Sequence, residues 1–221
     1  MTDVMVVAPH PDDETIGVGG TILRHREMGD RVAWIVVTGM TEDYGTERIS
    51  KRADEIERVA SAYGFADHIL LNFPTAQLDT VPRSEIIAAL GGAIRQFAPH
   101  TLYVPFPGDI HTDHAVVFAA AAAASKWFRS PSVSRLLAYE VPSETDVGVN
   151  PVELSFRPNI FVDVAKFIER KLEILRNFDS ELAPFPFPRS VEAVHNLAKV
   201  RGAASGFVAA EAFMLLRERL P

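Results

Sequence analysis

The sequence contains no cysteine among its 221 residues. Disulfide bonds and thiolate metal ligands are therefore excluded, and any metal ion must be held by histidine and carboxylate side chains. Basic residues are also few, since 22 lysines and arginines stand against 29 acidic residues and the formal net charge is −7. Because there is no run of basic residues, we expect neither nucleic acid nor an anionic membrane surface as a partner.

Long hydrophobic runs are absent as well. Residues 116–124 form one of the longest apolar stretches, which is too short to span a bilayer. The first residues do not combine a basic region with a long apolar segment, so we expect a cytoplasmic protein without a membrane span. A chain of 221 residues that is 48% hydrophobic can form a full core. We therefore expect a single domain over residues 1–221.

Predicted strands and helices alternate over the first part of the chain. Apolar or β-branched runs predict strands at residues 4–7, 31–38, 69–72 and 102–104. Apolar periodicity or a high alanine content predicts helices at residues 15–28, 47–63, 83–97 and 115–129. This alternation is typical of βαβ units. The expected fold class is therefore α/β, a single-domain Rossmann-like, mostly parallel sheet flanked by helices.

The order of elements is less regular after residue 129. Strands are expected at residues 136–141 and 159–164, and helices at residues 165–178 and 190–204. Residues 183–189 contain alternating prolines and are expected to be an extended loop. The pattern predicts no element for residues 207–220. Both tryptophans, Trp34 and Trp127, are expected in the core.

Ionisable residues are concentrated directly after the first predicted strand. Two prolines end that strand, and His10, Asp12, Asp13 and Glu14 stand around and after them. Carboxylates just before a helix commonly cap its N-terminus and compensate its dipole. An imidazole among three carboxylates is nevertheless costly unless a cation binds there, so we consider a metal site.

A second group of the same kind follows the predicted strand at residues 102–104. It contains Asp109, His111, Asp113 and His114. Because the carboxyl ends of neighbouring parallel strands meet at the same edge of a sheet, the two groups are expected to converge. Taken alone, either group would be interpreted as an ordinary polar loop. Their joint occurrence favours a shared site.

His10, Asp13 and His114 supply two imidazoles and one carboxylate. A catalytic zinc ion commonly has three protein ligands and one open position for water. The expected cofactor is therefore Zn²⁺, although the same ligands also suit Fe²⁺ or Mn²⁺. Such an ion lowers the pKa of a bound water to about 7.

The remaining residues of the two groups suit the chemistry of a hydrolase. Asp12 is the candidate general base, because Asp13 is taken as a ligand. Attack on a carbonyl creates an oxyanion that needs positive charge or hydrogen-bond donors. His111, protonated and held by Asp113, is the candidate for this stabilisation and for protonating a leaving amine.

At these residues the chain resembles the LmbE-like and PIG-L family of zinc-dependent N-deacetylases. The motif Pro-His-Pro-Asp-Asp-Glu stands at residues 9–14, and His-X-Asp-His stands at residues 111–114. The resemblance extends over nearly the whole chain. Two further segments are similar to the family's Arg-X-X-Glu helix and C-terminal segment, namely Arg52 with Glu55, and residues 210–213 preceded by Arg201 and Gly202.

The resemblance implies removal of the acetyl group from an N-acetylglucosamine-type sugar or sugar conjugate. It implies that His10, Asp13 and His114 bind the metal ion and that Asp12 is the general base. It also implies that His111, oriented by Asp113, stabilises the oxyanion or acts as the acid. It also implies that Glu14 and Arg52 contact substrate hydroxyl or phosphate groups. In some relatives a tyrosine two residues before His111 stabilises the oxyanion, and here that position is Asp109. Relatives often form oligomers, so a homo-oligomer is compatible with the resemblance.

Asp79 lies in a loop near the predicted strand ends and is a further candidate for binding a sugar hydroxyl, although a turn-capping role fits it equally. Two other functions stay open at this point. One is a metal-dependent hydrolase of a different amide or ester. The other is a non-catalytic binding module on a doubly wound scaffold, which requires that the two loops do not meet.

Overall fold

The computed structural model describes residues 2–149 and 154–220. Its strands are β1 (Asp3–Ala8), β2 (Arg31–Gly39), β3 (Asp67–Pro74), β4 (Thr101–Pro105), β5 (Arg135–Tyr139), β6 (Ile160–Asp163) and β7 (Ala210–Glu218). Its α-helices are α1 (Asp13–Glu27), α2 (Thr46–Tyr63), α3 (Arg83–Phe97), α4 (Thr112–Ala124), α5 (Ile168–Leu175) and α6 (Val191–Ser205). Short 3₁₀ helices are η1 (Glu42–Tyr44), η2 (Leu78–Thr80) and η4 (Asp179–Glu181).

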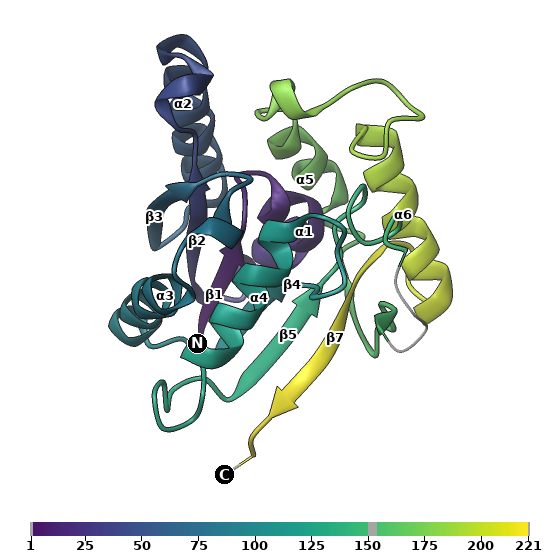
Figure 1. Ribbon diagram of the computed structural model, residues 1–221. Helices are drawn as coiled ribbons and strands as arrows, with labels where there is room; N and C mark the ends of the chain where they lie inside the picture. Colours follow the sequence, from purple (N-terminus) through teal and green to yellow (C-terminus); the bar gives the residue numbers. More distant parts are fainter. Residues whose placement is uncertain (1, 150–153, 221) are drawn as a thin grey trace.

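These strands form one sheet of seven in the order β3-β2-β1-β4-β5-β7-β6. The strands from β1 to β5 pair in parallel, and β7 runs antiparallel to both β5 and β6. Helices cover both faces of the sheet (Figure 1). The expected single-domain, mostly parallel α/β fold is therefore confirmed.

Alternate side chains of β1 enter two separate cores. Val4 and Val6 pack with apolar residues of α1, α2, α5 and α6 on one face, and we call this cluster the first core. Met5 and Val7 pack with α3 and α4 on the other face, in the second core. Both faces of the central strand are thus buried, as is typical of parallel sheets. Burial of each such side chain contributes about 1.5–3 kcal/mol to folding.

The sheet has its topological switch point between β1 and β4. The chain leaves β1 for α1 on the first-core face, whereas it leaves the neighbouring β4 for α4 on the opposite face. The two connections therefore diverge at the carboxyl ends of these strands. In open α/β sheets this is the place where ligands bind.

Several expectations about the second half of the chain need correction. The tail forms β7, whose residues Ala210, Ala212 and Phe213 are buried between β5 and β6. Helix α4 ends at Ala124, five residues before the expected position. Trp127 follows that end and is 62% exposed, so its assignment to the core is wrong, whereas Trp34 is fully buried. No helix in the described ranges is long and apolar enough to cross a membrane.

Candidate active site and metal centre

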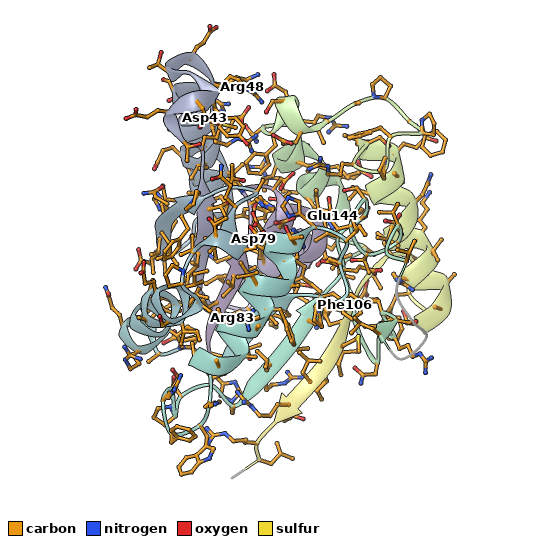
Figure 2. All side chains as sticks on the ribbon, viewed as in Figure 1. Asp43, Arg48, Asp79, Arg83, Phe106 and Glu144 are labelled. Atoms are coloured by element: carbon orange, nitrogen blue, oxygen red, sulfur yellow. The ribbon has the colours of Figure 1, made fainter. Side chains whose placement is uncertain are left out.

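A cavity of about 390 Å³ opens at the carboxyl ends of the central strands. Its volume lies within the range of about 300–1,000 Å³ that is common for small-molecule sites. Residues from the loops after β1, β2 and β5, from α2 and from the start of α4 line it. Figure 2 shows two residues of its lining, Arg48 on α2 and Glu144 on the loop after β5. The two predicted loops therefore do meet, at one cavity.

Three predicted ligands converge on the floor of this cavity. Oδ2 of Asp13 lies 3.4 Å from Nδ1 of His10 and 3.3 Å from Nε2 of His114. One ligand atom from each residue lies within 4.8 Å of the other two. Nε2 of His114 is buried and has no hydrogen-bond partner among the described residues. A buried nitrogen lone pair without a donor suits a metal ion, as does the pairing of two imidazoles with a carboxylate.

Two further carboxylates hold the rings of His10 and His114. Oδ2 of Asp113 lies 3.0 Å from Nε2 of His10, and Oδ2 of Asp109 lies 2.7 Å from Nδ1 of His114. Asp109 also accepts a hydrogen bond of 2.5 Å from the Thr145 hydroxyl. These contacts assign the ring protons to the nitrogens that face away from Asp13. When the rings are neutral, the opposite nitrogens direct their lone pairs toward the site, as in carboxylate–histidine–zinc arrangements.

The carboxylates also make the site attractive to positive charge. Burial opposes the charged form of His10, but hydrogen bonds to Asp113 and Asp13 outweigh it and raise its pKa to about 9. Burial likewise opposes charging of His114, yet Asp13 and Asp109 raise its pKa to about 10. Although burial disfavours the charged form of Asp13, its histidine partners hold its pKa well below the usual range. The pocket thus favours cations.

Asp12 lies beside this centre in an unusual backbone conformation. Its φ is 140°, a value that L-residues rarely adopt, and strain of this kind costs on the order of 1–3 kcal/mol. The residue is only 2% exposed, and Nη1 of Arg189 donates to its Oδ2 at 3.2 Å. Burial and the neighbouring Asp13 raise the pKa of Asp12 to about 7, although Arg189 opposes the shift. A carboxyl that titrates near neutrality suits a general base.

His111 differs from its expected state. Its Nδ1 accepts a hydrogen bond of 3.2 Å from the Asp113 backbone N–H at the start of α4. The Asp113 carboxylate bonds to His10 instead of the His111 ring. Burial and the charges of His10 and His114 lower the pKa of His111 to about 4. The structure thus does not place the Asp113 carboxylate on the His111 ring, and a role of His111 in catalysis stays a prediction. Because Nδ1 accepts the hydrogen bond from the Asp113 N–H, the proton of the neutral ring is assigned to Nε2.

Among the three predicted substrate contacts, only Arg52 lines the cavity. Nη1 of Arg52 donates to the Pro11 carbonyl at 3.0 Å, and Nε lies 3.2 Å from Oε2 of Glu55. Its Nη2 pairs with Glu181 of η4. Arg52 therefore ties the loop after β1 to α2 and to η4.

The other two predicted contacts lie outside the cavity lining. Glu14 is fully buried and accepts hydrogen bonds from the backbone N–H of Asp12 at 3.1 Å and from the Thr15 hydroxyl at 2.5 Å. Asp79, labelled in Figure 2, is exposed on η2. In this structure Glu14 supports the strained backbone of Asp12, and Asp79 makes no part of the cavity wall.

Sequence reasoning overlooked Arg189 and Glu181. Arg189 pairs with Asp12 at 3.2 Å and approaches Glu181 at 3.6 Å, although 177 residues separate it from Asp12. It ends the proline-rich loop at residues 183–189, which was expected only as an extended connection. No local pattern distinguishes this arginine from others on loops, so only the tertiary fold reveals it.

Known proteins are similar to this chain in sequence and in fold. A family model described as "PIG-L: GlcNAc-PI de-N-acetylase" matches residues 5–125, more than half of the chain. The match includes both groups of predicted site residues, from His10 to His114. The chain therefore belongs to the PIG-L family of deacetylases, as the resemblance in its motifs indicates.

Individual relatives cover most of the chain. The protein named uncharacterized deacetylase YaiS from Escherichia coli K12 is 27% identical over 183 residues, 80% of this chain and 90% of its own length. The diacetylchitobiose deacetylase of Thermococcus kodakarensis is 28% identical over 206 residues, 85% of this chain and 71% of its own. The crystal structure of the conserved protein TT1542 from Thermus thermophilus has a TM-score of 0.79 and 27% identity, covering 100% and 97% of the two chains.

Proposed function

We propose that this protein is a metal-dependent deacetylase that removes the acetyl group from an N-acetylglucosamine-type sugar or sugar conjugate. The observation that carries the proposal is the convergence of His10 Nδ1, Asp13 Oδ2 and His114 Nε2 beside the carboxyl of Asp12. Family membership and the substrate named for the Thermococcus relative support the choice of an N-acetylated sugar. Zn²⁺ is the proposed ion, and Fe²⁺ or Mn²⁺ are its alternatives.

His10, Asp13 and His114 would hold the ion, which when bound would acidify a water molecule and polarise the acetyl carbonyl. Asp12 takes the proton from the attacking water, since its pKa lies near 7. The neutral His111 donates its Nε2–H to the oxyanion that develops on the carbonyl oxygen. Asp12 then returns the proton to the departing nitrogen as the C–N bond breaks. Acetate and a free amine result.

Asp113 and Asp109 act through the ligands in this mechanism. Their hydrogen bonds orient the two rings so that Nδ1 of His10 and Nε2 of His114 face the site. Asp109 is thus occupied as a partner of His114 and does not replace the oxyanion-stabilising tyrosine of some relatives. His111 is the proposed donor in its place.

Acetate release from N-acetylglucosamine and its glycosides by the zinc-loaded protein tests the proposal. We expect Asp12→Asn to lower kcat by about 10²–10⁴-fold while the zinc content stays at the wild-type level. The exposed Asp54, on α2 and outside the cavity lining, provides the matched control Asp54→Asn. Full activity in zinc-bound Asp12→Asn would refute the base assignment.

A substrate panel separates this function from its alternative, hydrolysis of another amide or ester. Faster turnover of such a bond than of any N-acetyl sugar would favour the alternative. The binding module required that the two loops stay apart, and they meet at one cavity. A cytoplasmic location and a homo-oligomeric assembly stay predictions, and light scattering on the purified protein tests the assembly.

A further inference from the structure

Five apolar residues on α2, after β2 and on β3 form part of the cavity wall. They are Met40, Ile49, Ala53, Ile56 and Leu70. We call these five residues the apolar wall. The first turns of α2 extend beyond the carboxyl ends of the strands (Figure 1), and Ile49 belongs to these turns. A hydrolytic centre that handles only a small polar sugar does not need such a surface.

The apolar stripe of α2 explains part of the wall. Ile56, Val59 and Tyr63 pack in the first core at exposures of 6% or less. The same stripe continues towards the N-terminus of the helix through Ala53 and Ile49, at the spacing that keeps residues on one helix face. These two residues lie beyond the core and line the cavity instead. The apolar face of α2 thus extends beyond the residues that pack in the first core.

Strand β3 continues the same surface. Leu70 pairs in register with Val36 of β2, which is buried in the first core. Its neighbours Ile69 and Leu71 pack against the second core, so Leu70 points to the α2 side. Leu70 is 39% exposed and lines the cavity. The apolar face of α2 and that of β3 therefore both extend from the first core to the cavity.

Two of the three arginines that line the cavity are already paired with carboxylates. Arg52 is held by Glu55, Glu181 and the Pro11 carbonyl, and Arg189 is held by Asp12 and Glu181. An anionic group on a ligand would have to compete with these carboxylates. The third arginine, Arg48, has its guanidinium 5.4 Å from the centre of the Tyr44 ring. An apolar group on a ligand competes with none of these contacts and gains from burial against the apolar wall.

We propose that the apolar wall is a subsite for an apolar aglycone, so that the substrate is an N-acetylglucosaminide carrying an alkyl or aryl group. This inference rests on the proposed deacetylase function and adds the substrate class. A single exposed leucine would need no explanation. Here five apolar residues from three segments line the same cavity as the candidate metal ligands. The sugar lies at the metal centre and the aglycone lies along Ile49, Ala53 and Leu70.

Direct binding tests the subsite without turnover. Calorimetry with the zinc-loaded protein would compare methyl, n-butyl and glyceryl glycosides of glucosamine. Each buried methylene group strengthens binding by about fourfold, so partial burial of the added chain predicts that the butyl glycoside binds about tenfold tighter than the methyl glycoside. The glyceryl glycoside is similar in length but polar, and we expect it to bind like the methyl glycoside. Equal binding of butyl and methyl, or of butyl and glyceryl, would overturn the subsite.

Substitutions in the apolar wall test whether these residues cause the preference for the butyl glycoside. We expect Leu70→Ser and Ile49→Ser to reduce the butyl-to-methyl ratio to about threefold or less while the methyl glycoside binds as before. Leu216→Ser is the matched control, because Leu216 also lies on a strand and is 37% exposed, but does not line the cavity. It should keep the wild-type ratio, and the melting temperature of each variant checks folding. A ratio that survives in the Ile49→Ser, Leu70→Ser double variant would contradict the assignment.

The N-acetylated forms of the same glycosides separate this inference from the proposed reaction. A butyl preference in binding without any acetate release would support the subsite and refute the deacetylase function. Acetate release from the methyl glycoside without any butyl preference would support the deacetylase function and refute the subsite.

Discussion

The Asp113 carboxylate lies 3.0 Å from Nε2 of His10, although 103 residues separate them in the sequence. The same carboxylate accepts the backbone N–H groups of Ala76 at 2.7 Å and Leu78 at 3.1 Å. Its side chain is fully buried, so each of these bonds lies where water cannot replace it. Asp113 therefore fixes the orientation of His10 and joins α4 to the loop after β3.

Replacing this carboxylate should loosen the metal centre. We expect Asp113→Ala to weaken Zn²⁺ affinity by about 10- to 100-fold, because His10 loses the partner that sets its ring orientation. The buried N–H groups of Ala76 and Leu78 also lose their acceptor, at a cost of about 1–3 kcal/mol each in the free energy of unfolding. Competition with a chromogenic chelator measures the affinity, and Asp54→Ala is the control. Unchanged affinity would show that Asp113 does not position the ligand.

Metal binding should depend steeply on pH. His10 and His114 have pKa values raised to about 9 and about 10 in the metal-free protein, so both carry a proton at neutral pH. An ion must displace these protons, and affinity therefore rises with pH until they are lost. Between pH 6 and 8 we expect Zn²⁺ affinity to rise about 10- to 100-fold per pH unit. Calorimetry in buffers of different ionisation enthalpy should detect release of about two protons at pH 7. Release of no proton would contradict the proposal that the metal ion displaces protons from His10 and His114.

His111 should act as a neutral donor. We expect His111→Ala to keep the metal and to lower kcat by about 10²–10³-fold with little change in KM, because only the transition state bears the oxyanion. Since burial and the nearby histidine charges lower the pKa of His111 to about 4, its titration should not shape the wild-type profile between pH 6 and 9. A basic limb near pH 7 that disappears in His111→Ala would instead reveal a charged acid.

Arg189 should set the pH at which the base becomes active. Its guanidinium opposes the rise in the pKa of Asp12 that burial and Asp13 cause. In Arg189→Met the pKa of Asp12 should rise further, so that more of the base is protonated at low pH. We expect kcat/KM to fall about tenfold at pH 6 and much less at pH 9. An equal loss at both pH values would point to substrate binding rather than to the base.

The sheet and the position of the site could be predicted from the sequence because their signals are local. The apolar runs of β1 and β4 end at prolines, and each is followed by histidines and carboxylates. In a parallel sheet, neighbouring strands bring such loops to one edge. This rule places His10 near His114 without any knowledge of side-chain positions.

The partners within the site could not be predicted in this way. Asp113 stands two residues from His111, which suggested that its carboxylate bonds to that ring, yet helical backbone directs it to His10. Arg189 reaches Asp12 only because the loop before α6 returns over the cavity. Strand β7 owes its conformation to pairing on both edges, and a tail without turn signals does not reveal such pairing. Each of these features depends on contacts between distant segments.

Anomalous diffraction from crystals of the zinc-loaded protein tests the metal centre most directly. The structure offers two groups of candidate ligands, one formed by His10, Asp13 and His114 and the other by His10, His111 and Asp113. We predict a single peak at the zinc edge, about 2.0–2.2 Å from Nδ1 of His10, Nε2 of His114 and a carboxylate oxygen of Asp13. A peak bound by His111 and Asp113 instead would contradict the assignment of ligands, base and oxyanion donor together.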